Sequence, residues 1–174
     1  PDRLPLMRRT MQLTLEPPGQ RAEGDERIPI TLSSDSPVRR WFGEETLSHA
    51  ADAVDLSFAR DGLPFLVNHD TDRQAGLIED LTLRADGKLA GTVRFSRAPL
   101  GQEVRQDMLD GIRRNVSVGY RVDAMTLIET RDETDVFEVT RWTPMEGSTV
   151  PVPADITVGV GRDATREAYP VQVV

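Results

Sequence analysis

The feature that most constrains the fold is a series of short segments in which apolar and polar residues alternate. Residues 76–96 show it best, because the alternation continues on both sides of Asp86-Gly87, a dipeptide typical of a β-hairpin turn. Further alternating or apolar segments of strand length occupy residues 11–15, 28–32, 63–68, 115–124 and 125–142, the last divided across residues 130–133. So many short, closely spaced strands predict an antiparallel β core, formed as a barrel, rather than a doubly wound parallel sheet.

Two segments show helical spacing instead. Apolar residues recur at helical intervals in residues 99–112, with Pro99 at the expected start and Gly111 at the expected end, the favoured asymmetry for a helix. A second apolar series, made of Leu47, Ala50, Ala51, Val54 and Leu56, predicts another short helix. Residues 1–10 are interpreted as a polar tail. The predicted fold class is α+β, with a mostly antiparallel β-barrel core and a few peripheral helices.

Composition excludes several classes of protein. No run of 18 apolar residues occurs in the 174-residue chain, so we expect no membrane-spanning segment, and the first ten residues lack the apolar core of a secretion signal. Cysteine is absent, which excludes disulfides, a thiolate nucleophile and Cys-ligated metals. The net charge of −8 is unlike that of a typical nucleic-acid binder. Since the first residue is not Met, we expect a processed product or a piece of a longer protein.

A serine on a predicted strand is the first candidate for catalysis. In residues 115–124 the alternation places Val116, Val118 and Tyr120 on one face and Ser117, Gly119 and Arg121 on the other. Gly119 has no side chain, so another group can approach closely beside the Ser117 hydroxyl. On this segment alone, a polar residue on a solvated strand face is the better interpretation of Ser117.

Two further residues complete a possible nucleophile, base and orienting carboxylate. His69 ends the apolar run of residues 63–67, and the only other histidine, His49, lies in the predicted helix of residues 47–56. Glu146 precedes Gly147-Ser148-Thr149. A serine hydroxyl needs a neutral imidazole to take its proton, and the imidazole needs a carboxylate to fix its tautomer. Taken singly, His69 suits a strand–loop junction and Glu146 a solvated loop.

The order of these motifs resembles the prohead (capsid maturation) proteases of tailed bacteriophages, which are serine peptidases distantly related to herpesvirus assemblin. The resemblance covers roughly residues 28–160. It is carried by Val67-Asn68-His69-Asp70, Gly76-Leu77-Ile78, Ser117-Val118-Gly119-Tyr120, Glu146-Gly147-Ser148-Thr149-Val150 and Pro153-Ala154-Asp155. It implies a herpesvirus-protease-like fold, with Ser117 as nucleophile, His69 as general base and acid, and Glu146 as orienting carboxylate.

Several details depart from the family pattern or extend it. Gly147 replaces a branched apolar residue and Pro151 lies close by, which puts the pairing of that strand, and with it Glu146, in doubt. Asp70 is the alternative orienting carboxylate, although neighbours on an extended chain point in opposite directions. The Ser-His-His arrangement of assemblins is not expected, because His49 lies far upstream of the position needed. By analogy with an arginine-bearing loop in assemblin, Arg113 and Arg114 are candidate oxyanion donors; the alternative is a solvated turn.

The resemblance implies an endopeptidase that cleaves scaffold or capsid-protein extensions, and itself, in the assembling procapsid within the bacterial host cytoplasm. No cofactor or metal is implied, the protein substrate is the expected partner, and a homo-oligomer is expected because assemblins are activated by dimerisation. We expect an N-terminal tail and loop over residues 1–27, a protease domain over 28–160 and a C-terminal tail over 161–174. The alternatives are a catalytically inactive protease-fold module that binds scaffold or capsid protein, and an unrelated small ligand-binding β-barrel.

Overall fold

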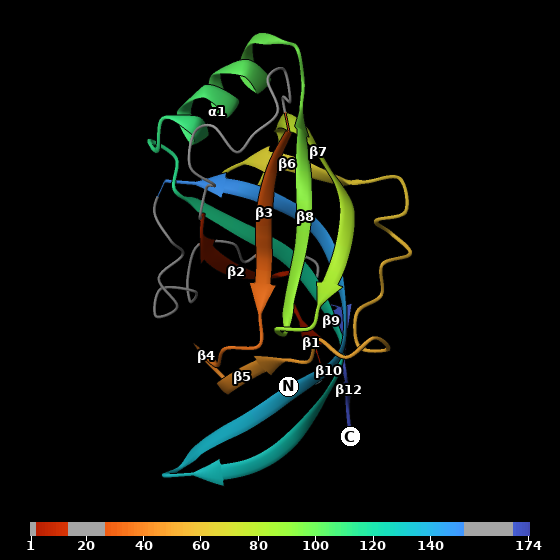
Figure 1. Cartoon of the computed structure of the whole chain (residues 1–174). Helices are drawn as coiled ribbons and strands as arrows, with labels where there is room; N and C mark the ends of the chain where they lie inside the picture. The colour runs from red at the N-terminus through yellow and green to blue at the C-terminus, as the bar shows by residue number, and fades with distance from the viewer. Residues whose placement is uncertain (1–2, 14–26, 152–168) are drawn as a thin grey trace.

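Two long strands, β9 (Asn115–Arg131) and β10 (Thr134–Val150), form the centre of the main sheet and pair antiparallel along their length. The computed structural model describes residues 3–13, 27–151 and 169–174. Within them the chain is mostly β, with one helix, α1 (Pro99–Leu109). The sheet curls strongly, so that β3 (Arg27–Ser34) and β8 (Lys88–Phe95) cross in front of β9 and β10 in Figure 1.

The main sheet is mixed, with both antiparallel and parallel pairs. Neighbouring strands run β12-β9-β10-β6-β7-β8-β3, and β2 also pairs with β9. The remaining bounds are β2 (Met7–Gln12), β4 (Val38–Arg40), β5 (Gly43–Leu47), β6 (Leu63–Val67), β7 (Asp70–Arg84) and β12 (Gln172–Val173). β5 and β6 pair parallel with β10, and β12 pairs parallel with β9. Most pairs in the described sheet are antiparallel, as predicted, but the sheet also contains parallel pairs and is a curled half-barrel instead of the predicted barrel.

The local patterns of the central region are confirmed. Strands β7 and β8 form the hairpin predicted around Asp86-Gly87, and α1 begins at Pro99 with Gly111 just past its end at a φ of 71°. The apolar face of β9 is buried, as its alternation predicts.

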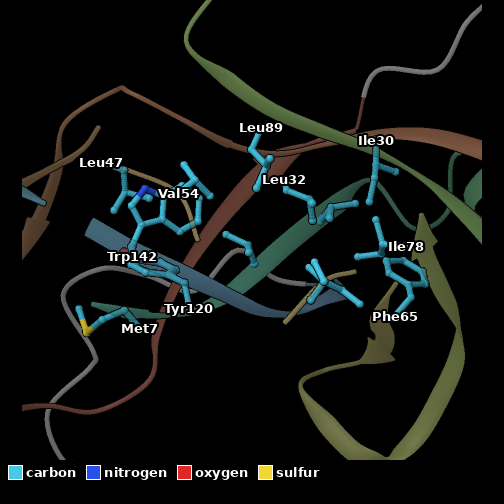
Figure 2. Packing of buried hydrophobic residues seen from close by; sticks show 14 of the residues in the cluster. Met7, Ile30, Leu32, Leu47, Val54, Phe65, Ile78, Leu89, Tyr120 and Trp142 are labelled. Carbon is cyan, nitrogen blue, oxygen red and sulfur yellow. The ribbon is translucent and has the colours of Figure 1, made fainter. Parts of the chain in front are cut away.

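The core lies inside the curl of the sheet. Trp142 and Tyr120 pack edge to face, with ring centroids 5.6 Å apart, and Figure 2 shows Leu47, Val54 and Met7 around them. Phe65 and Ile78 fill the other end of the same cluster. Burial of these large side chains stabilises the curled sheet, at roughly 1.5–3 kcal/mol for each one removed from water.

The helix predicted over residues 47–56 is wrong. Leu47 ends β5, and the following residues form turns in which the Ala53 N–H donates to the Ala50 carbonyl. The reason lies in the tertiary structure, because the backbone of this segment forms hydrogen bonds with β10. The Trp142 N–H donates to the Ala53 carbonyl, and the Asp55 N–H donates to the Trp142 carbonyl.

The polar tail predicted over residues 1–10 is also wrong for most of its length. Residues Arg3–Leu4 form β1, which pairs with β11 (Tyr169–Pro170), and β2 pairs antiparallel with β9. The basic residues of β2 conceal its alternation, because Arg9 points inward and is buried. The pairing of β1 and β2 does not test the predicted division into domains, which stays a prediction.

No helix in residues 3–13, 27–151 or 169–174 is long and apolar enough to cross a membrane.

Candidate catalytic site

The register between β9 and β10 gathers the polar residues of both strands on one face. Ser117 lies opposite Ser148, and Gly119 lies opposite Glu146. Residues directly opposite each other in an antiparallel pair point to the same side of the sheet. This face is turned away from the core face, to which Val118 and Gly147 belong.

His69 lies in the two-residue turn that joins β6 to β7. Val67 pairs with Asp70, and both central residues have positive φ, 55° for Asn68 and 59° for His69. Two-residue hairpins favour this backbone, and Asn, Asp and His tolerate it better than other residues with side chains. β10 holds the turn in place, because the Asn68 N–H donates to the Thr149 carbonyl at 3.0 Å and the His69 N–H donates to Ser148 Oγ at 3.0 Å.

The structure joins the side chains of His69 and Glu146. His69 Nδ1 forms a hydrogen bond with Glu146 Oε1, and the two side chains are 7% and 15% exposed. An ionised carboxylate only accepts hydrogen bonds, so Nδ1 carries the proton in the neutral ring. His69 Nε2 is then the nitrogen with a free lone pair, as a general base requires.

Gly119 creates the space that the Glu146 carboxylate occupies. A Cβ atom at position 119 would overlap Glu146 Oε1. The sequence predicted that another group could approach beside the Ser117 hydroxyl at this glycine. The approaching group is the Glu146 carboxylate.

Ser117 is fully buried on β9, between β2 and β10. Its hydroxyl and His69 Nε2 are both buried and form no hydrogen bond in the part of the chain that the structure describes. Buried polar groups are usually paired, and unpaired ones call for an explanation. Seven buried side-chain atoms of the described residues lack a partner, and these two are the ones between which the sequence predicts proton transfer.

The sequence put the strand pairing at Gly147 in doubt, but Gly147 is paired on both sides. Gly147 pairs with Val118 on one side and Phe65 on the other, and β10 continues to Val150, one residue before Pro151. The space of the missing branched side chain is filled by Ile78 and Leu32, which a Cβ atom at position 147 would meet. The motif residues 153–155 lie outside the described residues.

Arg113 and Arg114 lie in the turn between α1 and β9. Arg113 Nε donates to Asp107 Oδ2 and Arg114 Nε donates to the Gly111 carbonyl, each at 3.0 Å. Both side chains are therefore held toward the end of the helix. The predicted oxyanion role of the two arginines is not tested by this arrangement and stays a prediction.

The other two candidates lie apart from the contact between His69 and Glu146. Asp70 is exposed and accepts a hydrogen bond from the Asp72 N–H. His49 lies beyond β5, where its ring bonds Ser33 Oγ at 2.8 Å and the Leu47 carbonyl at 3.0 Å. Burial lowers the pKa of His49, which favours the neutral ring.

Sequence reasoning missed Ser148. Its hydroxyl accepts the hydrogen bond from the His69 N–H and donates one to Glu146 Oε2 at 2.9 Å. The only signal in the sequence was its spacing, because residues two apart on a strand share a face, so Glu146 and Ser148 point the same way.

Among the described residues, no group of three or more His, Cys, Asp or Glu side chains is arranged to hold a metal ion.

Comparison with known proteins places the chain in a family. The family model of the Caudovirus prohead serine protease matches residues 32–167, most of the chain, and the chain therefore belongs to the prohead serine protease family. It is also 41% identical, over 147 residues, to the major capsid protein of Halomonas phage phiHAP-1. That match covers 83% of this chain and 24% of the capsid protein, so the chain spans about a quarter of its relative. No solved structure matches the chain significantly.

Proposed function

We propose that this chain is a serine endopeptidase that cleaves scaffold or capsid-protein extensions, and itself, during phage capsid maturation. Membership of the prohead serine protease family supports the class of reaction. The observation that carries the residue roles is the His69–Glu146 hydrogen bond on the strand face that also bears Ser117.

The proposed mechanism uses one proton carrier and one acyl intermediate. Ser117 Oγ attacks the carbonyl carbon of the scissile peptide while His69 Nε2 takes the hydroxyl proton. Glu146 accepts from Nδ1–H and stabilises the imidazolium that forms. His69 then gives the proton to the leaving amine, whose C–N bond breaks, and a water molecule hydrolyses the Ser117 ester by the same route in reverse.

The choice between the two facing serines follows from their hydrogen bonds. The single proton of the Ser148 hydroxyl is donated to Glu146, so it is not available to His69. The Ser117 hydroxyl forms no hydrogen bond among the described residues. Ser117 is therefore the better nucleophile, and the two serines give a matched pair of variants.

Stabilisation of the tetrahedral oxyanion is assigned to the turn before β9. Hydrogen-bond donors near the developing negative charge account for much of the rate gain in acyl transfer. Arg113 and Arg114 stay the candidate donors, and their side chains would have to leave Asp107 and the Gly111 carbonyl to reach the site.

The proposed substrate is the phage's own capsid or scaffold protein. Support comes from the Halomonas phage major capsid protein. A region that is 41% identical to this chain makes up 24% of that polypeptide. A protease joined to its substrate acts at high effective concentration. We place the reaction inside the assembling procapsid in the host cytoplasm and expect the active form to be a homo-oligomer.

Intact-mass spectrometry of assembled particles tests the proposal. The full-length gene product would be expressed with its capsid protein as wild type, Ser117→Ala and His69→Ala. We expect trimmed chains for the wild type and only full-length chains for both variants. Identical trimming in all three would contradict the proposal. Untrimmed chains in assembled wild-type particles would favour an inactive protease-fold module that binds capsid or scaffold protein.

A further inference from the structure

We propose that Ser148 is a positioning residue that holds His69 and Glu146 together in the orientation the reaction needs. The inference rests on the proposed function, because it concerns the same site. It adds a residue whose side chain acts on both partners of the His69–Glu146 hydrogen bond without taking part in the transfer of the proton.

The position of Ser148 in the sheet makes its hydroxyl well suited to fix other groups. Ser148 is fully buried and lies in the middle of three strands, opposite Ser117 of β9 and Leu66 of β6. Its backbone is held on both sides, so the Oγ atom has a fixed origin. Groups that form hydrogen bonds with that atom are therefore held in a fixed position relative to the sheet.

The Ser148 hydroxyl uses its hydrogen-bonding capacity on both catalytic candidates. It accepts from the His69 backbone N–H at 3.0 Å and donates to Glu146 Oε2 at 2.9 Å. Glu146 Oε1 receives His69 Nδ1, so each carboxylate oxygen has its own partner and the carboxylate cannot rotate freely. One side chain thus fixes both the backbone of the base and the plane of the carboxylate.

The turn that carries His69 needs such a contact. Asn68 and His69 both have positive φ, a conformation that is sterically unfavourable for a residue with a side chain and that the surrounding structure must hold. Without the Ser148 hydroxyl, the His69 N–H would lose its partner and the imidazole would lose its fixed origin. Small displacements of a catalytic group lower the reaction rate strongly.

The chain offers a matched control in Ser33. Ser33 is also fully buried, and its Oγ bonds His49 Nε2 at 2.8 Å. Ser33→Ala removes a buried hydroxyl bonded to a histidine, as Ser148→Ala does, but away from the candidate catalytic site. A loss of function that exceeds that of Ser33→Ala is not explained by loss of a buried hydroxyl alone.

Labelling of the full-length protein by a fluorophosphonate, a serine-directed probe, measures the effect. We expect Ser148→Ala to lower the labelling rate constant by about 10- to 100-fold. Ser148→Thr, which keeps the hydroxyl, should recover most of this rate, Ser33→Ala should match the wild type, and Ser117→Ala should not be labelled. In NMR spectra, Ser148→Ala should weaken the low-field His69 Nδ1–H signal and speed hydrogen exchange of the His69 amide.

The outcomes separate this inference from the proposed function. Labelling of Ser148→Ala at the wild-type rate, with the His69 amide still protected, would overturn the role of Ser148. An unlabelled wild type would contradict the proposed function. In that case the His69 Nδ1–H signal and the exchange of the His69 amide would still test whether Ser148 positions His69 and Glu146. If both were unchanged in Ser148→Ala, the role of Ser148 would be overturned.

Discussion

Two glycines in neighbouring rows of the β9–β10 ladder serve opposite faces of the sheet. Gly119 opens the site face for the Glu146 carboxylate, and Gly147 opens the core face for Ile78 and Leu32. At both positions the absence of a side chain, not backbone freedom, is what the structure uses. An added methyl group should therefore have different consequences at the two positions.

Gly119→Ala should damage the site, and Gly147→Ala should damage the core. At position 119 the new methyl group displaces the Glu146 carboxylate and not the backbone, so we expect labelling of Ser117 to fall by about 10-fold or more with little loss of stability. At position 147 it meets packed side chains, so the free energy of unfolding should fall by about 1–3 kcal/mol. Urea denaturation and probe labelling measure the two effects, and the reverse pattern would contradict the assignment of faces.

His49 makes a prediction about acid stability. Burial lowers its pKa, so between this value and the unfolded value of about 6.5 the unfolded chain binds more protons than the folded one. The contribution of His49 is therefore fully present above about pH 6.5 and is lost as the pH falls through the lowered pKa. Thermal melts from pH 8 to pH 5 should show a smaller drop in Tm for His49→Gln than for the wild type. Equal slopes would contradict the prediction.

At the scale of elements, two hairpin turns share one backbone geometry. Asn68-His69 joins β6 to β7, Asp132-Glu133 joins β9 to β10, and all four residues have positive φ. The first turn presents the candidate base. The second lies at the tip of the arm that β9 and β10 extend beyond the rest of the sheet, as Figure 1 shows.

Glu133→Gly should stabilise the protein. Glu133 has a φ of 61°, which glycine adopts without steric cost, so we expect a gain of about 1 kcal/mol. Glu138→Gly is the control, since residue 138 lies inside strand β10, where glycine should lower stability by roughly 0.5–1 kcal/mol. Calorimetry of both variants measures the difference. A lower Tm for Glu133→Gly would show that the turn does not need the positive φ.

At the scale of the whole molecule, a buried network fastens the N-terminal strand to the rest of the sheet. Glu45 Oε1 accepts from the Tyr120 hydroxyl at 2.6 Å, from Arg9 at 3.1 Å and from Arg40 at 3.2 Å. These four residues come from four strands, β2, β4, β5 and β9. Burial raises the pKa of Tyr120, so its hydroxyl stays protonated and donates to Glu45.

Arg9 also bonds the carbonyls of Ser34 and Ser36, at 2.7 and 2.8 Å, so it connects β2 to a third segment. Strand β2 precedes the residues that match the family model, yet it pairs with β9 alongside Ser117. The N-terminal strand is thus an integral part of the sheet that carries the candidate nucleophile.

Arg9→Met should destabilise the protein strongly. The change removes one of the two cations bound to the buried Glu45 and leaves the Ser34 and Ser36 carbonyls without their donor, so we expect a loss of about 3 kcal/mol. Arg39→Met is the control, because Arg39 is exposed and its replacement should change stability by less than about 0.5 kcal/mol. Urea denaturation compares the variants. Equal stability of the two would show that the network does not hold β2.

Features fixed by short-range patterns could be read from the sequence. The hairpin at Asp86-Gly87, helix α1 and the two faces of β9 follow from alternation, turn residues and helix-end residues, each within a few positions. The helix over residues 47–56 and the polar tail over 1–10 were wrong, because contacts with Trp142 and Glu45, distant in the chain, decide those segments.

The candidate site shows the same division. The sequence by itself placed Ser117 and Gly119 on one strand face and offered His69 and Glu146 as a possible base and carboxylate, and the resemblance implied the role of each. Only the tertiary structure decided that Glu146 shares this face, because the ladder shifts register between Pro144 and Glu146. A shift of one residue exchanges the two faces of a strand, and no periodic pattern records where it occurs. The contact between His69 and Glu146 likewise arises where a turn meets a strand 77 residues further along the chain.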